Sequence, residues 1–169
     1  LPGATFTVAS DDRLRSEVRL KGVAMLRIGI STRALFDLEE ENKLFERDGA
    51  DAYDAHQLAN EHEPLRPGTA YPLVRGLLSL NQHLPEDSRV EVTIMSRNSA
   101  DVSIRIFHSC AALGLPIQRG AFTRGRSLSD YFRAYGVDLF LSRHPGDVQA
   151  AIDAGIAGAL VLDPPRGPT

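Results

Sequence analysis

Leu-Arg-Ile-Gly-Ile-Ser-Thr-Arg-Ala-Leu-Phe-Asp, residues Leu26 to Asp37, is the stretch around which the rest of the chain can be interpreted. Its apolar positions alternate as in a half-buried strand, and the polar step Ser31-Thr32-Arg33 follows them directly. An acidic run that favours a helix begins at Leu38. In an open α/β sheet, ligands bind where strands end and the chain turns into helices. The pattern therefore predicts a strand over 23–31 whose carboxyl end carries a binding site.

The composition is that of an ordinary globular domain. The 169 residues are 43% hydrophobic and 24% charged, and a net charge of −3 gives no broad basic field, so no nucleic-acid partner is expected. No apolar run approaches the ~20 residues of a membrane span, and the first ten residues lack the pattern of a signal peptide. Cys110 is the single cysteine, which excludes an internal disulfide, and its apolar neighbours indicate a buried helical thiol. We therefore expect a cytoplasmic protein with no membrane partner.

Strand and helix patterns alternate along the chain. Further strands are expected over 90–95, 115–117, 137–141 and 156–162, and helices over 38–48, 50–61, 70–83, 100–113, 128–135 and 145–154. This order favours a three-layer, Rossmann-like α/β domain with a parallel sheet covered on both faces. We expect this domain to span 23–165, with a small helical cap inserted at about 38–66. The structure of 1–22 is left open, apart from a possible edge strand over 4–9, and 166–169 is a tail.

Within these helices, some side chains have expected roles. Leu44 and Phe45 supply the apolar face of the first helix, and Tyr53 and Leu58 point inward from the second. The acidic residues 39–41 suit a solvated helix start better than a metal site, because the helix dipole favours negative charge there. Asn98 or Ser99 is expected to cap the helix that begins at about 100.

Three of the predicted strands end in polar steps. These are Ser31-Thr32-Arg33, Ser96-Arg97-Asn98 and Ser142-Arg143, and a basic loop with Arg124 and Arg126 precedes the third. On a parallel sheet these ends can converge on one crevice. Hydroxyl groups and guanidinium groups there suit an anion such as phosphate. Because polar residues commonly follow strands, ordinary loop chemistry is the alternative to an anion site.

Several longer strings then carry a family resemblance. The strings from Ile30 to Asn42, Phe45 to Gly49, Glu61 to Gly68 and Met95 to Asn98 resemble the cytosolic 5'-nucleotidase type I family, and the likeness runs over about 27–164. That family belongs to the haloacid dehalogenase superfamily of phosphatases. The resemblance implies a haloacid dehalogenase-like fold, a cytoplasmic hydrolase, and magnesium-dependent release of phosphate from nucleoside monophosphates, typically AMP.

The resemblance also maps the superfamily's catalytic positions onto this chain. In the superfamily, the first strand ends in Asp-x-Asp, which supplies the nucleophile and the general acid and base; a later Ser or Thr binds phosphate, and acids after the fourth strand hold magnesium. Here Ser31 stands at the nucleophile position, Arg33 at the acid/base position and Ser96 at the hydroxyl position. Ser142-Arg143 replaces the metal acids, and Arg124 or Arg126 falls roughly at the position of the superfamily's cation.

These departures prevent the standard mechanism at this crevice. A serine without a neighbouring base is a weak substitute for an aspartate nucleophile, and an arginine cannot be deprotonated in a protein. Magnesium prefers anionic oxygens, which Ser142 and Arg143 do not offer. We therefore expect a crevice of hydroxyls and positive charge, with no metal bound by this chain alone. Asp37 is a weak candidate metal ligand and is better explained as a structural cap.

The family offers an explanation for the missing acids. Full-length type I nucleotidases are longer than this chain, and a later segment carries the intact Asp-x-Asp motif, which is absent here. The resemblance therefore implies a catalytically incomplete half with a crevice for phosphate or a nucleoside monophosphate. Its other partners would be a C-terminal catalytic half or a second copy of the chain. The alternative is a non-catalytic structural or regulatory nucleotide-binding module.

Two aromatic residues and the histidines are further candidate ligand contacts. Tyr71 and Phe122 could stack on a nucleobase, although aromatic residues in apolar surroundings more often belong to the core. The five histidines are scattered, and their spacing predicts no zinc site.

Overall fold

The computed structural model describes residues 25–163. The open segment 1–22, the possible edge strand over 4–9, the beginning of the first strand at 23 and the tail over 166–169 lie outside the described residues.

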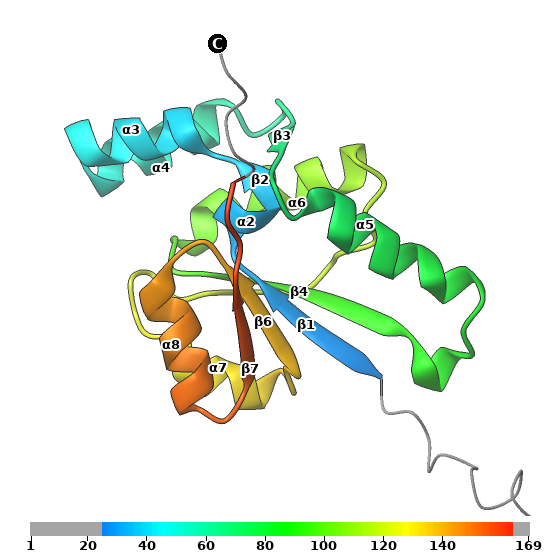
Figure 1. Cartoon of the computed structure of the whole chain (residues 1–169). Coiled ribbons are helices and arrows are strands. Elements are labelled where there is room, and N and C mark those ends of the chain that lie inside the picture. Colours follow the sequence, from blue (N-terminus) through cyan, green and yellow to red (C-terminus); the bar gives the residue numbers. More distant parts are fainter. Residues whose placement is uncertain (1–24, 164–169) are drawn as a thin grey trace, which may run out of the picture.

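A five-stranded parallel sheet forms the centre of the domain, in the order β5-β4-β1-β6-β7. Its strands are β1 (Leu26–Ile30), β4 (Val90–Ser96), β5 (Gly120–Phe122), β6 (Leu139–Ser142) and β7 (Ala157–Leu160). Ile30 of β1 pairs with Ile94 of β4 on one side and with Leu141 of β6 on the other. The direction of winding therefore reverses at β1, and Figure 1 shows its carboxyl end between those of its two neighbours.

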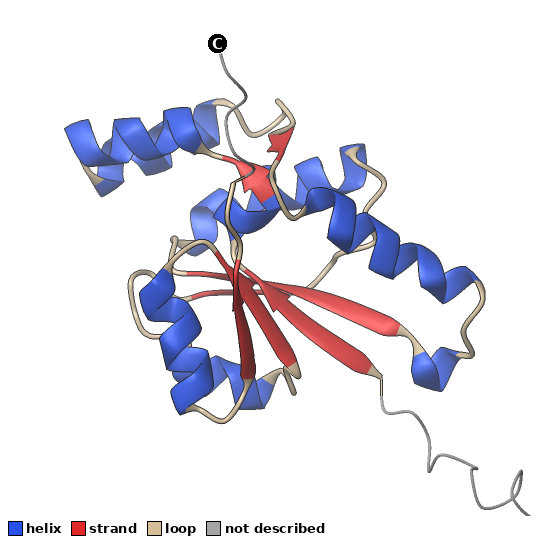
Figure 2. Cartoon of the chain, viewed as in Figure 1, coloured by secondary structure: helices blue, strands red, loops and turns tan. Residues whose placement is uncertain are grey.

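Helices cover both faces of this sheet, which confirms the three-layer Rossmann-like architecture (Figure 2). The helices are α2 (Thr32–Leu35), α3 (Glu39–Asp48), α4 (Ala50–Ala59), α5 (Tyr71–Ser79), α6 (Ser103–Ala112), α7 (Ser129–Ala134) and α8 (Pro145–Asp153), with short 3-10 turns η1 (Leu80–Gln82), η2 (Glu86–Ser88) and η3 (Ala100–Val102). One core cluster joins β1 and β4 to α5 and α6 through residues such as Ile28, Val74 and Ile106. A second cluster, with Phe132 and Phe140, packs α7 and α8 against the other face.

Gly29 separates these two clusters within β1. A Cβ atom at this position would lie 2.8 Å from Sδ of Met95 and 3.1 Å from the ring of Phe140. The second core is therefore packed directly against the backbone of the central strand, which is why a glycine interrupts the apolar run there.

An excursion of two helices leaves the sheet layer after β1. The antiparallel two-residue strands β2 (Phe36–Asp37) and β3 (Arg66–Pro67) form its base, and α3 and α4 form what we call the helical hairpin. Gly49 separates the two helices with a φ of +86°, a backbone conformation that glycine adopts without strain. Figure 1 shows the helical hairpin beyond the carboxyl ends of the strands, on the side where β1 ends.

Three local expectations were wrong. The segment 115–117, expected to be a strand, is irregular. Gly114 ends α6 in a left-handed turn, and the next apolar side chains, Leu115 and Ile117, are buried in the core. Pairing with β4 therefore begins only at Gly120. Leu58 is exposed, and Gln57 takes the inward position on α4.

The third wrong expectation concerns the start of α6. Neither Asn98 nor Ser99 caps a helix with its side chain, since a 3-10 turn, η3, precedes α6 and both side chains bond to α4 instead.

Candidate functional site

A cavity of about 520 Å³ opens at the carboxyl ends of β1, β4 and β6, beside the point where the winding reverses. The structure brings Ser31, Ser96 and Ser142 together in its lining, from three strands that are far apart in the sequence. This is the place where open α/β sheets bind their ligands.

Two walls enclose the cavity, and they differ in origin. The strand-tip wall consists of residues 31–33, 95–99, 124–125, 142–144 and 147, which follow strands of the sheet. The hairpin wall consists of residues 38, 42, 45, 50–51 and 53–54, which belong to the helical hairpin or its first turn. Of the candidate residues from the sequence, Arg126 and Asp37 lie outside the lining.

The hydroxyl groups of Ser96 and Ser142 occupy equivalent turns at the ends of neighbouring strands. Oγ of Ser96 accepts a hydrogen bond from the backbone N–H of Asn98, and Oγ of Ser142 accepts one from the backbone N–H of His144, both at 3.1 Å. Both serines are buried. Because each oxygen serves as an acceptor here, its hydroxyl hydrogen is not used in that bond.

Two polar atoms beside these turns are unsatisfied. Oγ of Ser31 and Nε of Arg33 are buried and have no hydrogen-bond partner among the described residues. A buried donor without a partner costs about 1–3 kcal/mol, so such groups are uncommon in folded proteins. Both atoms belong to residues that line the cavity.

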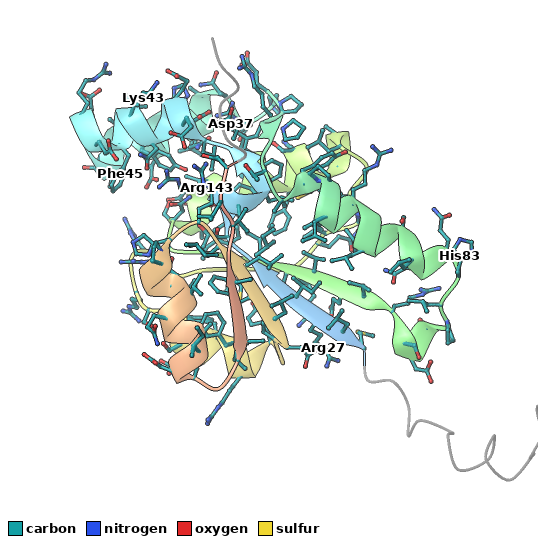
Figure 3. All side chains as sticks on the ribbon, in the orientation of Figure 1. Arg27, Asp37, Lys43, Phe45, His83 and Arg143 are labelled. Atoms are coloured by element: carbon teal, nitrogen blue, oxygen red, sulfur yellow. The ribbon has the colours of Figure 1, made fainter. Side chains whose placement is uncertain are left out.

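Three cavity arginines are already paired with acids. Arg143 contacts Glu39 at 3.1 Å and Asp163 at 2.5 Å, and Glu39 also lies 3.6 Å from Arg33. Figure 3 shows Arg143 between the helical hairpin and the strand ends. These acids reduce the positive charge that the sequence led us to expect, because each pair is close to neutral.

Arg97 is the third of these arginines. Its Nη1 lies 3.5 Å from Oδ1 of Asp147, which itself lines the cavity at the start of α8. His144 also lies 3.7 Å from Asp147.

Arg124 differs from the other cavity arginines. It is the one non-glycine residue within 25–163 that has a positive φ, at +50°, and Gly125 follows with a φ of +83°. The backbone N–H of Arg126 donates to the carbonyl oxygen of Thr123 at 3.2 Å, which closes a tight turn around these two residues. No ion pair involves the guanidinium of Arg124 within the described part of the chain. A strained backbone thus presents an unpaired cation at the cavity.

Direct hydrogen bonds join the two walls. Nδ2 of Asn98 donates to the phenolic oxygen of Tyr53 at 3.1 Å, and the hydroxyl of Ser99 donates to Asp54 at 3.0 Å. Burial raises the pKa of Tyr53, because its ionised form would lose solvation there.

Behind these contacts, a buried arginine attaches the helical hairpin to α6. The guanidinium of Arg105 donates to Glu41 at 3.1 Å, to Gln57 at 2.8 Å and to the carbonyl oxygen of Glu63 at 3.0 Å. The side chains of Arg105 and Glu41 are only 8% and 11% exposed. One charged side chain therefore holds α3, α4 and the following loop together.

The residues of the cavity do not fit a magnesium ion. Arg143 lines the cavity at the end of β6, and its positive charge opposes a cation. Of the three aspartates in the lining, Asp54 is engaged by Ser99 and Asp147 by Arg97, so that Asp51 alone would have to hold the ion. Across residues 25–163, no group of three or more histidine, cysteine, aspartate or glutamate side chains is placed to hold a metal ion.

Asp37 is exposed, and its Oδ1 accepts a hydrogen bond from the backbone N–H of Glu39 at 3.2 Å. This local contact reaches the first residue of α3, although the N-cap position itself is held by Leu38, whose side chain cannot cap the helix.

Several residues of the lining escaped prediction from the sequence. Phe45, Asp51, His144 and Asp147 all line the cavity, although none follows a strand directly. The spacing of Asn42 and Phe45, three residues apart on one helical face, is the signal that could have placed them together.

The two aromatic candidates do not lie at the cavity. Tyr71 donates to the carbonyl oxygen of Leu113, and the ring of Phe122 meets that of Phe107 edge to face; both pack against the first core. Cys110 is buried as predicted, and burial raises the pKa of its thiol to about 12. Within 25–163, no helix has the length and apolar character needed to cross a membrane.

Comparison with known proteins places these observations in a family. The family model described as 5'-nucleotidase matches residues 19–167. Human cytosolic 5'-nucleotidase 1B is 33% identical to the chain over 143 residues, which cover 82% of this chain and 23% of that protein. The chain thus spans less than a quarter of the length of this relative.

Proposed function

Because the chain belongs to the 5'-nucleotidase family, we propose that it binds the phosphate of a nucleoside monophosphate of the AMP type without hydrolysing it. In this proposal, the chain is a catalytically incomplete half of a nucleoside monophosphate phosphohydrolase. The cleavage step then belongs to another part of the full-length enzyme.

The unsatisfied atoms of Ser31 and Arg33 are the observation that carries this proposal. One is a hydroxyl and the other a guanidinium N–H, and both are buried beside the same cavity. A phosphate oxygen accepts hydrogen bonds from both types of group. The hydroxyl hydrogens of Ser96 and Ser142 and the unpaired charge of Arg124 add further donors in the same lining.

The same residues argue against turnover by this chain. Oγ of Ser31 has no hydrogen-bond partner, so no base is in position to take its proton. Arg33 cannot act as a general acid or base, because its guanidinium keeps its proton in proteins. Arg143 in the lining carries a positive charge, which disfavours a metal ion beside it.

Titration calorimetry of the purified chain with AMP and with inorganic phosphate tests the binding. We expect both to bind, and we expect Arg124→Ala to weaken both by about tenfold or more, because it removes a charge-assisted contact. Arg126→Ala is the matched control, since Arg126 has the same charge in the same loop but lies outside the lining. Equal losses in the two variants, or no binding by the wild-type chain, would leave the chain a purely structural half.

A phosphate-release assay with AMP and magnesium tests the absence of turnover. We expect no release above the rate without protein. Turnover that disappears in Ser31→Ala would show that the chain is itself a phosphatase, and the proposal would be wrong.

A further inference from the structure

We propose that β7 is the contact through which two copies of this chain associate, with their two β7 strands paired side by side in antiparallel orientation. The inference concerns the free edge of the sheet and does not depend on the proposed anion site. It makes a second copy of the chain the partner, and it joins the two sheets into one continuous sheet.

The two edges of the sheet are protected to different degrees. β5 and β7 end the sheet, so each pairs with a neighbouring strand on one side only (Figure 1). At the β5 edge, the hydroxyl of Tyr135 donates to the carbonyl oxygen of Gly120 at 3.1 Å, and the guanidinium of Arg119 lies 5.3 Å from the centre of the Tyr135 ring. A side chain and a charge therefore cover that edge, as is common for edge strands in natural proteins.

The β7 edge has no such cover among the described residues. Residues 154–162 include no charged side chain and no proline. Apolar side chains are exposed along and beside the strand: Leu160 is 41% exposed, Ile152 on α8 is 50% exposed and Leu162 is 71% exposed. An uncharged edge strand with exposed apolar side chains is a template on which another strand can pair.

The open backbone groups of this edge follow from the pairing with β6. The N–H of Val161 donates to the carbonyl oxygen of Ser142 at 2.8 Å, so Val161 directs its backbone groups toward β6. Successive residues of a strand alternate in this direction, and Ala159 therefore also faces β6. Gly158 and Leu160 alternate with these two residues, so their N–H and C=O groups point away from the sheet.

These open groups fit a second copy in one register. In an antiparallel pair, two opposed residues exchange both of their backbone hydrogen bonds. If Gly158 stands opposite Leu160 of the second copy, the two-fold axis passes beside Ala159, and every open group of both residues is paired in both copies. A register shifted toward Ile156 would lose bonds, because the N–H of Ile156 already donates to the carbonyl oxygen of Ala151 at 2.9 Å.

The side chains agree with this register. Gly158 packs closely against α8, since a Cβ atom there would lie 3.0 Å from Cγ1 of Val148 and 3.3 Å from Cγ1 of Ile152. Leu160 of one copy would stand opposite Gly158 of the other, beside the exposed side chain of Ile152. The pairing thus buries apolar side chains that are exposed in the single chain, and it brings no like charges together.

Sedimentation velocity of the full chain over a range of concentrations tests the association. We expect a reversible equilibrium between monomer and dimer, and we expect Leu160→Lys to weaken it by about tenfold or more, because it places a charge on the pairing edge. The matched control is Leu73→Lys, which adds the same charge at a residue that is 52% exposed on α5. A wild-type chain that stays monomeric at its highest soluble concentration would overturn the proposal, and so would equal weakening in the two variants.

An engineered disulfide tests the register itself. In the Cys110→Ala background, Ala159→Cys places two cysteines directly opposite each other, where the Cα atoms of such a pair lie about 4.5 Å apart and a disulfide can form. We expect mild oxidation to give a covalent dimer. Ala157→Cys is the matched control and should not cross-link, because Ala157 stands opposite Val161 and its two copies lie roughly 14 Å apart. Equal cross-linking of both variants, or of neither, would show that the β7 strands do not pair in this way.

Discussion

The strand-tip wall and the hairpin wall enclose one cavity but are built in opposite ways. The strand-tip wall has hydroxyls and arginines on short turns that the parallel sheet fixes in place. The hairpin wall has two aromatic rings and two aspartates on helices that reach the rest of the domain through a few polar contacts and through the buried side chains of Leu38 and Tyr53. The difference shows that one wall inherits its rigidity from the fold, while the other depends on individual side chains.

Replacing Arg105 should loosen the hairpin wall far more than the strand-tip wall and should give the largest effect. Arg105→Met leaves the carboxylate of Glu41 in a largely buried position without its partner, which lowers the free energy of unfolding by about 3 kcal/mol. Urea denaturation measures the loss, and hydrogen exchange should show faster exchange in α3 and α4 than in the sheet.

Arg119→Met is the control for that variant. Its guanidinium pairs with Glu91 but is 51% exposed, so less than about 1 kcal/mol should be lost. Uniformly faster exchange across the sheet and the helical hairpin in Arg105→Met would contradict the view that the hairpin wall is a separately held part.

Replacement of Gly68, at the base of the helical hairpin, should give the next largest loss of stability. A Cβ atom there would lie 2.7 Å from the carbonyl carbon of Phe36 and 2.9 Å from that of Leu35, and backbone atoms cannot move aside easily. We expect Gly68→Ala to lower the free energy of unfolding by about 2 kcal/mol.

Gly76→Ala serves as the comparison for Gly68→Ala. No heavy atom lies within 4 Å of its ideal Cβ on α5, so the change should stabilise the chain by about 0.5–1 kcal/mol through helix propensity. Losses of similar size in both variants would contradict the steric explanation.

The strand-tip wall was largely predictable from the sequence, and the hairpin wall was not. Ser31, Ser96 and Ser142 follow strands whose apolar patterns are clear, and the rules for parallel sheets bring their ends together. The direction in which Phe45 faces depends instead on how α3 docks, which local spacing does not determine. Leu58 shows the same limit, because Arg105 draws the polar Gln57 inward and leaves the leucine exposed.

Substitutions of Arg124 test whether its positive φ strains the backbone of the strand-tip wall. Arg124→Gly and Arg124→Ala both remove the cation, but only glycine adopts a φ of +50° without strain. We therefore expect the free energy of unfolding of the glycine variant to be about 1 kcal/mol higher than that of the alanine variant. Both variants should lose affinity for phosphate. Equal stabilities in thermal unfolding would show that the turn is relaxed as it stands.

The pH dependence of stability that Cys110 causes is the smallest of the expected effects, and it depends on the burial of this α6 side chain in the core. Burial raises the pKa of its thiol to about 12, whereas in the unfolded chain the thiol ionises near 8.5. As pH rises, the thiol therefore ionises in the unfolded chain before it ionises in the folded chain. Its ionisation stabilises the unfolded state, so the free energy of unfolding falls as pH rises from about 8.5 toward 12.

Between pH 7 and 9, this contribution should fall by about 0.5–1 kcal/mol in the wild-type chain and not in Cys110→Ala. Denaturant unfolding at the two pH values measures it, and identical pH dependences would contradict it. Alkylation of the thiol should also stay slow in Arg105→Met if only the helical hairpin loosens.

The order of strands around β1 has a consequence for how the chain folds. Ile30 pairs with Ile94 and Leu141, so the three strand ends meet only after long crossovers have closed, and such pairings form late and slowly. A partly folded chain therefore has no cavity to offer. A ligand that needs the finished cavity should slow unfolding while leaving the refolding rate unchanged, because it stabilises contacts that are absent from the transition state.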